Sequence, residues 1–333
     1  MRVLILLGGD SAERDVSWSS GLAVARALAS RHHDVTGLDP ATGEYFRGSW
    51  YGRETEIART PPHPAGASAA PSRLVESLSD PGLSTYDVVF IALHGGSGED
   101  GTVQSLLGLA GAAYTGSGPL ASGVAMHKDT TKRLLVQAGV PTPDWIYPHK
   151  PDDDAIARLG LPLIVKPVAE GSTVGLSLVK ESGQFEAALA KAGDPLLERF
   201  IPGRELSVPI LDGRALPPVE IVPQHEIYDY ECKYTDGMSE YHCPAPLSPD
   251  TTSLVCELAG RAFAALGCQD YARIDFRLAS DGRPYCLEAN TLPGMTSHSL
   301  VPLSAGQVGL DLPALCETIC RLATARHGRP RSG

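Results

Sequence analysis

Two short apolar runs, each ending in a glycine-rich loop, most constrain how this chain can fold. Residues 3–7 lead into Gly8-Gly9, and residues 87–93 lead into residues 94–101, four of which are glycine. Continuous apolar runs are typical of parallel strands buried on both faces. In open α/β folds, the loops at the carboxyl ends of such strands hold ligands. The first third of the chain is therefore predicted to be an open α/β unit, with a helix starting near Ser17.

Length and composition favour a soluble protein of two or three domains. The chain has 333 residues, too many for one ordinary core, of which 43% are hydrophobic and 20% are charged. A net charge of −11 argues against a nucleic-acid partner, because no basic stripe is left to neutralise phosphates. No apolar run approaches the roughly 18 residues of a membrane span, and no cleavage site follows the first strand. We expect a cytoplasmic protein without a membrane partner.

Cysteine usage favours reduced thiols. All seven cysteines lie between Cys232 and Cys320, their number is odd, and no CxxC pair occurs. This pattern argues against a disulfide framework and against a zinc ribbon.

Composition shifts divide the chain into three units. Glycines and Pro119 cluster at residues 117–125, which predicts a first boundary there. Residues 41–82 are rich in Pro, Gly and Ser and are predicted to be surface connections with little regular structure. We expect an N-terminal α/β domain at 1–122, a smaller α+β unit at 123–197 and a C-terminal unit at 198–333.

Periodicity predicts the elements of the last two units. The second unit should contain a helix at 128–137, strands at 163–166 and 176–179, and a helix near 183–191. The third should contain strands at 205–211, 218–222 and 273–278, a long loop at 223–250, and helices at 250–266 and near 311–325. A basic tail from Arg326 is expected to be frayed.

A predicted hairpin carries candidate metal ligands. Asp275 lies on a strand, Asp281-Gly282 forms the turn, and Glu288 and Asn290 return on the next strand. Residues two apart on a strand project to one face. Two carboxylates and an amide oxygen converging there suit Mg²⁺, which fills its other positions with phosphate and water. A solvated hairpin with ordinary surface charges is the alternative.

A second element has the composition of a phosphate-binding loop. Residues 170–175 lie between two predicted strands and contain two glycines and two hydroxyl side chains. Lys166 ends the preceding apolar strand, where a lysine is costly unless it meets an anion. No GxxxxGK[ST] and no GxGxxG after the first strand occur, which excludes a Walker loop and disfavours a dinucleotide fold. Taken alone, the loop is also compatible with a plain hairpin, and Lys128 with a solvated helix lysine.

Together with further motifs, these segments resemble the D-alanine–D-alanine ligase family of ATP-grasp enzymes over nearly the whole chain. The matching stretches are residues 8–17, 94–101, 166–175, 228–234, 273–276 and 290–300. The resemblance implies an N-terminal α/β (pre-ATP-grasp) domain followed by a two-subdomain ATP-grasp fold. It also implies D-alanine and ATP as substrates, two Mg²⁺ (or Mn²⁺) ions per active site, and a homodimer.

The resemblance implies nucleotide and metal roles for residues of the last two units. ATP would lie between those units, with its phosphates contacted by Lys128 and Lys166. Adenine and ribose would be held by Glu198, Arg199, Phe200, Ile201 and Glu205. The two metal ions would be bound by Asp275, Glu288 and Asn290.

The substrate roles follow from the same resemblance. Glu13 would receive the ammonium of the first D-alanine, with His94 nearby, and Arg273 and the Gly294 N–H would form the oxyanion site. The second D-alanine site would be shaped by Lys233, Tyr234, Ser299 and Leu300. Ser172 would tie the loop that bears Tyr234 to the phosphate cover.

The residue chemistry agrees with such a ligase. A carboxylate is a poor acyl donor, so ATP must first convert it to an acyl phosphate, a transfer that two metals and two lysines support. A related ligase that uses D-lactate or D-serine as acceptor is the close alternative, and Lys233-Tyr234 is the feature that discriminates. An ATP-binding regulatory protein without turnover and a nicotinamide oxidoreductase are the alternatives from other classes.

Overall fold

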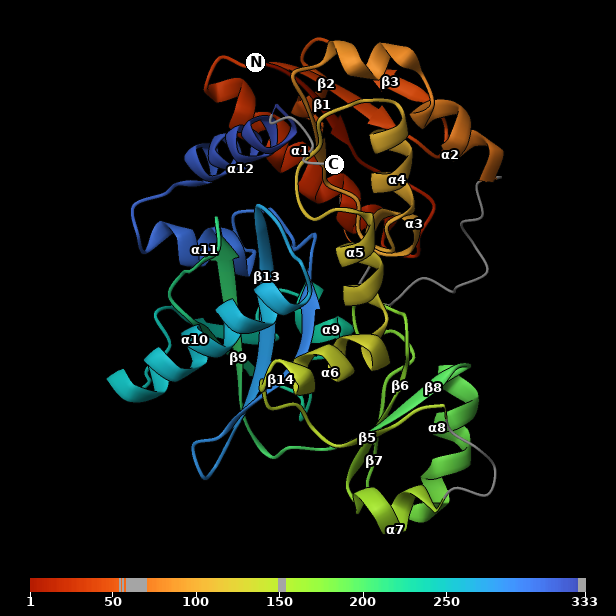
Figure 1. Ribbon diagram of the computed structural model, residues 1–333, viewed down its shortest axis with the longest axis vertical. Helices are drawn as coiled ribbons and strands as arrows, with labels where there is room; N and C mark the ends of the chain where they lie inside the picture. Colours follow the sequence, from red (N-terminus) through yellow and green to blue (C-terminus); the bar gives the residue numbers. More distant parts are fainter. Residues whose placement is uncertain (54, 56, 58–70, 149–153, 329–333) are drawn as a thin grey trace.

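Three β-sheets organise the computed structural model, which describes residues 1–333 except 54, 56, 58–70, 149–153 and 329–333 (Figure 1). The first sheet has the order β3-β2-β1-β4, with β1 at Arg2–Leu6, β2 at Asp34–Asp39, β3 at Glu44–Phe46 and β4 at Val88–Ile91. Strands β1, β2 and β4 are parallel. The two glycine-rich loops therefore meet at one sheet edge, where the Ser11 hydroxyl donates to the His94 carbonyl.

Both faces of this first sheet are buried. Val3 and Ile5 face a core that includes α1 (Arg14–Ser30) and α12 (Leu312–His327). Leu4 and Leu6 face a second core, with α2 (Pro71–Leu78) and α4 (Thr102–Leu109). Burial on both faces explains the uninterrupted apolar run. The predicted first helix begins about one turn earlier than expected, at Arg14.

Residues 41–82 contain more regular structure than predicted. Besides β3, the described part holds 3₁₀ turns at Trp50–Gly52 and Pro81–Thr85, and helix α2. Leu74 and Leu78 are buried and lie four apart, on one side of α2. The prediction of irregular connections was wrong here, because burial of that helical face overrides a composition rich in turn residues. Residues 54, 56 and 58–70 of this segment lie outside the described residues.

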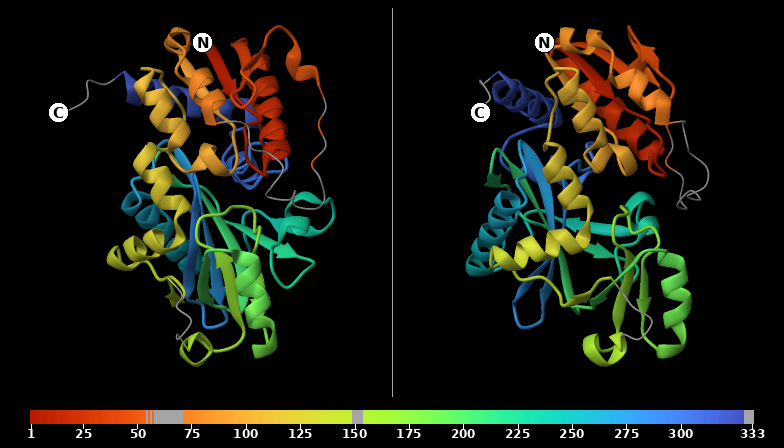
Figure 2. Two further views of the ribbon diagram at one scale, coloured as in Figure 1. Left: turned by 90° about the vertical axis from the view of Figure 1, so that its right-hand side faces the viewer. Right: turned by 45° about the vertical axis from the view of Figure 1, so that its right-hand side comes forward.

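The second sheet is small and antiparallel, in the order β5-β8-β6-β7. Its strands are β5 (Trp145–Ile146), β6 (Leu163–Pro167), β7 (Ser177–Val179) and β8 (Pro195–Arg199). Helices α7 (Ala155–Leu159) and α8 (Phe185–Ala192) share one core with it and lie on the side away from the third sheet (Figure 2). The other side therefore remains available to form the wall of a cleft.

The third sheet has six strands, in the order β12-β11-β9-β13-β14 with β10 paired to β9. The strands are β9 (Gly203–Leu211), β10 (Arg214–Ala215), β11 (Val219–Pro223), β12 (Ser239–His242), β13 (Tyr271–Ala279) and β14 (Pro284–Asn290). Helices α5 (Pro119–Met126), α6 (Lys128–Gln137) and α10 (Pro249–Ala265) contribute to its core. The expected α/β and α+β arrangement is confirmed.

The pleat of the third sheet separates core from polar residues. The even-numbered side chains of β9 and β13, such as Leu206, Ile274 and Phe276, lie in the core beneath α10. The odd-numbered side chains, including Ser207 and Asp275, lie on the other face. Because successive side chains of a strand point to opposite faces, one strand supplies both packing and chemistry.

Two predictions about loops were wrong. The expected long loop at 223–250 contains helix α9 (Tyr230–Tyr234) and strand β12, because Asp229 caps α9 and β12 pairs with β11. We call residues 224–238, which connect β11 to β12, the lid. The tail was expected to be frayed from Arg326, but Arg326 lies in α12, where its guanidinium is 3.0 Å from Asp270 and donates to two backbone carbonyls. Residues 329–333 of that tail lie outside the described residues.

Helix α12 links the end of the chain to its beginning. Leu315, Ile319 and Ala323 share the core of β1, so the final helix packs on the first sheet rather than on the third. The boundaries near residues 122 and 197 stay predictions. All seven cysteines are free thiols, as expected. Within the described ranges, no helix has the length and apolarity needed to cross a bilayer.

Candidate active site

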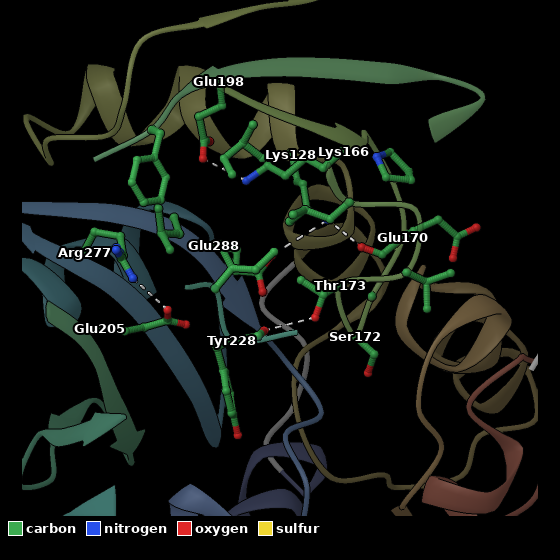
Figure 3. Close-up of a pocket in the computed structure, with 18 of the residues that line it drawn as sticks. Lys128, Lys166, Glu170, Ser172, Thr173, Glu198, Glu205, Tyr228, Arg277 and Glu288 are labelled. Carbon is green, nitrogen blue, oxygen red and sulfur yellow. Dashed lines mark hydrogen bonds and ion pairs between the residues drawn. The ribbon is translucent and has the colours of Figure 1, made fainter. Parts of the chain in front are cut away.

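Two cavities share one wall between the sheets. The first lies between the second and third sheets and is lined by residues such as Lys166, Glu198 and Arg277 (Figure 3). The second reaches from there to the glycine-rich loops of the first sheet. The shared wall consists of Lys128, Glu170, Gly171, Ser172, Tyr228, Lys233 and Glu288.

Almost every residue predicted for the site lines one of these cavities. The predicted residues that line the first are Lys128, Lys166, Ser172, Glu198, Arg199, Phe200, Ile201, Glu205, Lys233 and Glu288. Those that line the second are Glu13, His94, Lys128, Ser172, Lys233, Tyr234, Arg273, Glu288, Asn290, Gly294, Ser299 and Leu300. Asp275 lines neither, because it lies behind Arg273 and beside Ser207 on the face of the third sheet.

The predicted hairpin forms with the expected register. Asp275 pairs with Glu288 and Arg273 pairs with Asn290, and a β-bulge follows Asp275. Bulges insert an unpaired residue and redirect side chains, often beside active sites. Here the bulge falls at Leu287, which lines the first cavity.

Arg273 and Asp275 form a fixed pair on β13. Arg273 donates from Nε (2.9 Å) and Nη2 (2.7 Å) to the Asp275 carboxylate, which also accepts from Ser207 Oγ at 2.7 Å. A two-point Arg–carboxylate contact holds the guanidinium plane in one orientation. The remaining face of Arg273 lines the second cavity.

Glu288 is ionised and surrounded by cations. Burial raises the pKa of this carboxyl, but Lys128, Lys233 and Lys166 outweigh burial and lower it to about 2. The nearest ion pair is to Lys128 Nζ, at 3.8 Å. Lys128 Nζ also donates to the Glu170 carbonyl at 2.6 Å, which ties the lysine to the phosphate-loop candidate.

A buried lysine that the sequence did not single out supports the first cavity. Lys132 is fully buried, lies 2.6 Å from Glu198 and donates to Thr142 Oγ1 at 2.7 Å. Lys166 contacts the other Glu198 oxygen at 3.1 Å. Burial raises the pKa of Glu198, but the two lysines outweigh it and hold that pKa low. Lys132 follows Lys128 by four residues, so their common helical face was an available signal.

The loop at residues 170–175 holds two strained residues. Ser172 has φ of 46° and Thr173 has φ of 61°, a left-handed conformation that is rare for a β-branched side chain. Such strain costs on the order of 1–3 kcal/mol per residue and persists only where neighbours enforce it. Thr173 Oγ1 donates to the Tyr228 carbonyl at 3.2 Å, and Ser172 Oγ lies 2.8 Å from the Tyr234 hydroxyl. The loop is therefore fastened to the lid.

The second contact of Ser172 is with Glu13, next to the first sheet. Its hydroxyl donates to Glu13, which the Tyr234 hydroxyl also approaches, at 3.5 Å. Glu13 follows the first glycine-rich loop, Ser172 lies on the loop after β6, and Tyr234 ends α9. One hydrogen-bonded group thus joins the three sheet units of the chain.

Burial shifts the pKa values of Glu13 and of the titratable groups near it. Burial raises the pKa of Glu13, and burial together with the Glu13 charge raises the pKa of Glu99 to about 8. Burial lowers the pKa of His94 to about 4, so this ring is neutral near pH 7. His94 Nε2 is 2.8 Å from Ser20 Oγ, and Nδ1 is 3.9 Å from Glu99. Glu99 was not predicted as a site residue, although it lies in the motif at 94–101.

Gly294 and Ser299 approach each other closely at the far end of the second cavity. A Cβ atom at position 294 would lie 2.8 Å from Ser299 Oγ, so only glycine fits without displacement. Ser299 Oγ in turn accepts from the Thr296 N–H at 3.0 Å. The turn thus leaves a backbone segment facing the cavity next to Arg273.

Comparison with known proteins assigns this arrangement to a family. Residues 2–117 match the family described as D-ala D-ala ligase N-terminus, and residues 134–321 match D-ala D-ala ligase C-terminus. A D-alanine–D-alanine ligase of Azoarcus sp. is 45% identical over 98% of both chains. One from Cupriavidus necator is 41% identical over 97% of this chain and 92% of its own. The chain belongs to the D-alanine–D-alanine ligase family.

Solved structures of relatives have the same fold. The D-alanine–D-alanine ligase from Bacillus anthracis complexed with ATP is 28% identical and covers 98% of both chains, with a TM-score of 0.77. The ligase from Coxiella burnetii gives a TM-score of 0.81 at 26% identity, covering 98% of this chain and 94% of its own. The VanG D-Ala:D-Ser ligase from Enterococcus faecalis gives 0.77 at 26% identity, covering 97% and 99%. The fold expected from the resemblance is confirmed.

Replacing Lys132 tests its role beneath the ligase cavity. Lys132→Met removes one of two cations from a buried carboxylate and should lower the free energy of unfolding by about 3 kcal/mol, measured by urea denaturation. Arg133→Met is the control, because Arg133 is exposed and its pairing with Asp129 should contribute less than about 1 kcal/mol. Equal effects of the two substitutions would contradict a structural role for the buried pair.

Proposed function

We propose that this protein joins two D-alanines into D-alanyl-D-alanine through a D-alanyl phosphate, at the expense of ATP, for peptidoglycan precursors. The observation that carries the proposal is the hydrogen-bonded group of Glu13, Ser172 and Tyr234, which lines the second cavity and reaches the shared wall through Ser172. It places a carboxylate suited to an ammonium ion next to a strained, glycine-containing loop suited to phosphates. Membership of the ligase family supports the same reaction class.

ATP fits the first cavity. Lys128 and Lys166 are buried cations at its phosphate end, near the loop at residues 170–175. At the opposite end, Glu205 is held 3.1 Å from Arg277, whose guanidinium carbon lies 5.3 Å from the centre of the Phe200 ring. We assign adenine and ribose to the stretch of the cavity lined by Glu198, Arg199, Phe200, Ile201 and Glu205, which runs from Glu198, 3.1 Å from Lys166, to Glu205.

The donor set on the hairpin fits divalent cations with oxygen ligands. Glu288 is ionised, and Asn290 Oδ1 accepts only the Leu292 N–H, at 3.0 Å, among its contacts within the described chain, which leaves a lone pair for a cation. Asp275, Glu288 and Asn290 would hold two Mg²⁺ (or Mn²⁺) ions, and Asp275 would do so by exchanging part of its contact with Arg273 for a cation. Bound there, the cations would neutralise charge on the transferred phosphoryl group.

The remaining residues position the two amino acids. Glu13 accepts the ammonium of the first D-alanine, whose carboxylate then faces the nucleotide phosphates across the shared wall. Arg273 and the Gly294 N–H stabilise the oxyanion that forms when the second amine attacks the acyl phosphate. Losing one such donor typically costs about 3–4 kcal/mol. Lys233, Tyr234, Ser299 and Leu300 line the acceptor end.

A product assay tests the proposal. The protein is incubated with ATP, Mg²⁺ and a panel of D-amino and D-hydroxy acids, and the products are identified by mass spectrometry. D-alanyl-D-alanine with ADP and phosphate is the expected result. A preference for D-lactate or D-serine would reassign the acceptor, and ATP binding without turnover would identify a regulatory protein.

If Glu288 binds the metal ions, removing its charge should lower activity. Glu288→Gln should lower phosphate release by at least about 100-fold with an unchanged circular dichroism spectrum, because an amide does not balance divalent charge as a carboxylate does. Asp281→Asn is the control, an equivalent change at the exposed turn of the same hairpin. Normal turnover of Glu288→Gln at an ordinary Mg²⁺ concentration would show that Glu288 is not a metal ligand in the active site.

Substitutions of Glu13 and of its neighbour Glu99 test whether Glu13 binds the ammonium of the first D-alanine. Glu13→Gln should raise the KM for the first D-alanine by about tenfold or more and the KM for ATP much less, since a charge-assisted hydrogen bond is lost. Glu99→Gln is the control at pH 7, where Glu99, with a pKa of about 8, is already neutral. We expect that control to change the KM for the first D-alanine less than about threefold. Equal changes in both constants for Glu13→Gln would make Glu13 structural.

Acceptor choice is predicted to depend on the Tyr234 hydroxyl. Tyr234→Phe removes its hydrogen bond to Ser172 and should raise the D-lactate to D-alanine ratio of kcat/KM by about tenfold, equivalent to ~1.4 kcal/mol, with ATP binding nearly unchanged. Tyr228→Phe removes a lid hydroxyl that contacts Tyr241 instead and should leave the ratio unchanged. A competition assay with both acceptors decides, and an unaltered ratio in the Tyr234 variant would exclude the lid from acceptor choice.

We further propose that the enzyme works as a homodimer in the cytoplasm. Seven free thiols support a reducing compartment. Light scattering after size-exclusion chromatography measures the assembly directly.

A further inference from the structure

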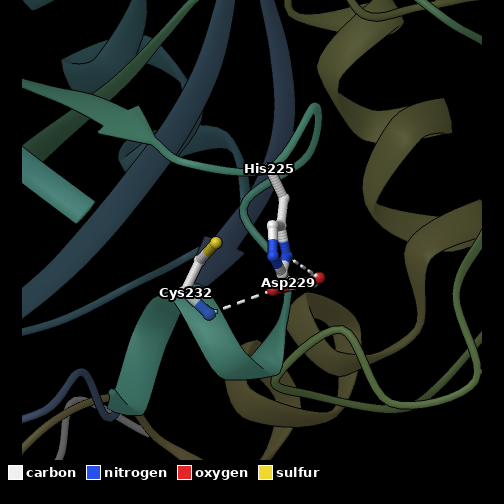
Figure 4. A group of neighbouring side chains, drawn as sticks. All are labelled: His225, Asp229 and Cys232. Carbon is white, nitrogen blue, oxygen red and sulfur yellow. Dashed lines mark hydrogen bonds and ion pairs between the residues drawn. The ribbon is translucent and has the colours of Figure 1, made fainter. Parts of the chain in front are cut away.

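A second group of metal-ligating side chains lies in the lid, outside both cavities. Within the described residues, His225, Asp229 and Cys232 each place a ligand atom within 4.8 Å of the other two (Figure 4). None of the three lines the active-site cavities, and the proposed function gives none of them a role.

The local chain conformation holds these three side chains together. Asp229 caps α9, where its Oδ1 accepts the Cys232 N–H at 3.0 Å. Its second oxygen, Oδ2, is thereby directed to His225 Nδ1, at 2.7 Å. Since all three residues lie within eight positions of one another, little chain entropy is lost in bringing them together.

The donor set is that of zinc rather than of magnesium. Zinc binds thiolate sulfur at about 2.3 Å and imidazole nitrogen or carboxylate oxygen at about 2.0–2.2 Å, so tetrahedral ligand atoms lie roughly 3.3–3.7 Å apart. The ligand atoms now lie within 4.8 Å of one another, so metal binding would draw them closer by rotation of the side chains. Magnesium prefers six oxygen ligands and does not select a thiolate and an imidazole.

We propose that His225, Asp229 and Cys232 bind one thiophilic divalent cation such as Zn²⁺, with water as the fourth ligand, and that the bound ion braces the lid. In forming the site, the ion replaces the hydrogen bond between His225 and Asp229. The Cys232 S–H bond breaks as the metal–sulfur bond forms, the imidazole nitrogen of His225 that binds the metal gives up its proton, and the released protons pass to solvent. Burial raises the pKa of the Cys232 thiol, so the thiol stays protonated until a metal displaces the proton.

Bracing follows from where the ligands lie in the lid. Cys232 precedes Lys233 and Tyr234 on the five-residue helix α9. Between His225 and Asp229, the lid is already attached to the small sheet unit through the ion pair of Glu226 with Lys180 and the bond from Thr173 to the Tyr228 carbonyl. A bound ion would join the exposed start of this segment to the helix that carries the acceptor-site residues. Opening of the lid would then require loss of a metal ligand or movement of the whole segment.

Metal titration of the full-length protein tests the site. The protein is treated with a chelator, desalted, and titrated with Co²⁺ and then Zn²⁺ in excess Mg²⁺. We expect one equivalent to bind, with the near-ultraviolet charge-transfer absorption of a cobalt–thiolate bond. Cys232→Ala should abolish that absorption, and His225→Ala should weaken binding by about tenfold or more. Cys256→Ala, a half-buried thiol on α10, is the matched control and should bind normally.

Two results would overturn the site. One is cobalt–thiolate absorption that persists in Cys232→Ala. The other is unchanged metal affinity in His225→Ala, which would mean that Cys232 binds the metal without His225. Because His225 is exposed, its replacement leaves the fold intact even if Cys232→Ala does not fold. None of these readouts depends on turnover, so failure here leaves the proposed ligase activity unaffected.

Amide hydrogen exchange tests the bracing of the lid. With Zn²⁺ bound, peptides that cover residues 224–238 should exchange at least about threefold more slowly in the wild type and in Cys256→Ala, but not in Cys232→Ala. Binding of Zn²⁺ without slower exchange in these peptides would refute the bracing.

Discussion

The alternation of side chains along β9 and β13 is the constraint on which the rest of the structure depends. Even-numbered residues such as Leu206, Ile274 and Phe276 fill the core under α10, and odd-numbered residues such as Glu205, Arg273 and Arg277 line the active-site cavities. A register slip by one residue would exchange the two sets, placing the Asp275 carboxylate in the apolar core and Phe276 on the polar face of the sheet. The strand register that buries Ile274 and Phe276 also places Asp275 opposite Glu288. Packing of the core therefore fixes the positions of these site residues.

Charge compensation is the second organising interaction. The cleft concentrates buried carboxylates and lysines that are each costly alone. Glu198 is neutralised by Lys132 and Lys166; Lys132 also donates to Thr142 and Pro143, whereas Lys166 keeps donors for a ligand. Glu288 is ionised because three lysines surround it, and those cations are also suited to a polyanionic nucleotide. The arrangement favours a substrate that brings both phosphates and metal ions.

The loop at residues 170–175 couples the three units. Its left-handed Ser172 and Thr173 are strained, and their hydroxyls contact the lid and Glu13. The same hydrogen bonds hold the loop in its strained conformation at the wall between the two cavities. If the hydrogen bonds of this loop break together, both cavities can open at once. Such coupling suits an enzyme that must admit three substrates and exclude water.

The sequence by itself determined most of the elements, the two glycine-rich loops and the hairpin that pairs Asp275 with Glu288, and the family resemblance pointed to residues that nearly all line the two cavities. Apolar periodicity and turn residues are local signals, and the hairpin register follows from strand alternation across a short turn. Tertiary structure alone decided the rest. Residues 71–78 become a helix because Leu74 and Leu78 meet a buried sheet face, and Lys132 becomes a site residue because Glu198 lies opposite it. Helix α12 returns to the first sheet, and Arg326 is ordered by Asp270. These contacts join residues far apart in the chain, and no local pattern encodes which distant partner a side chain will meet.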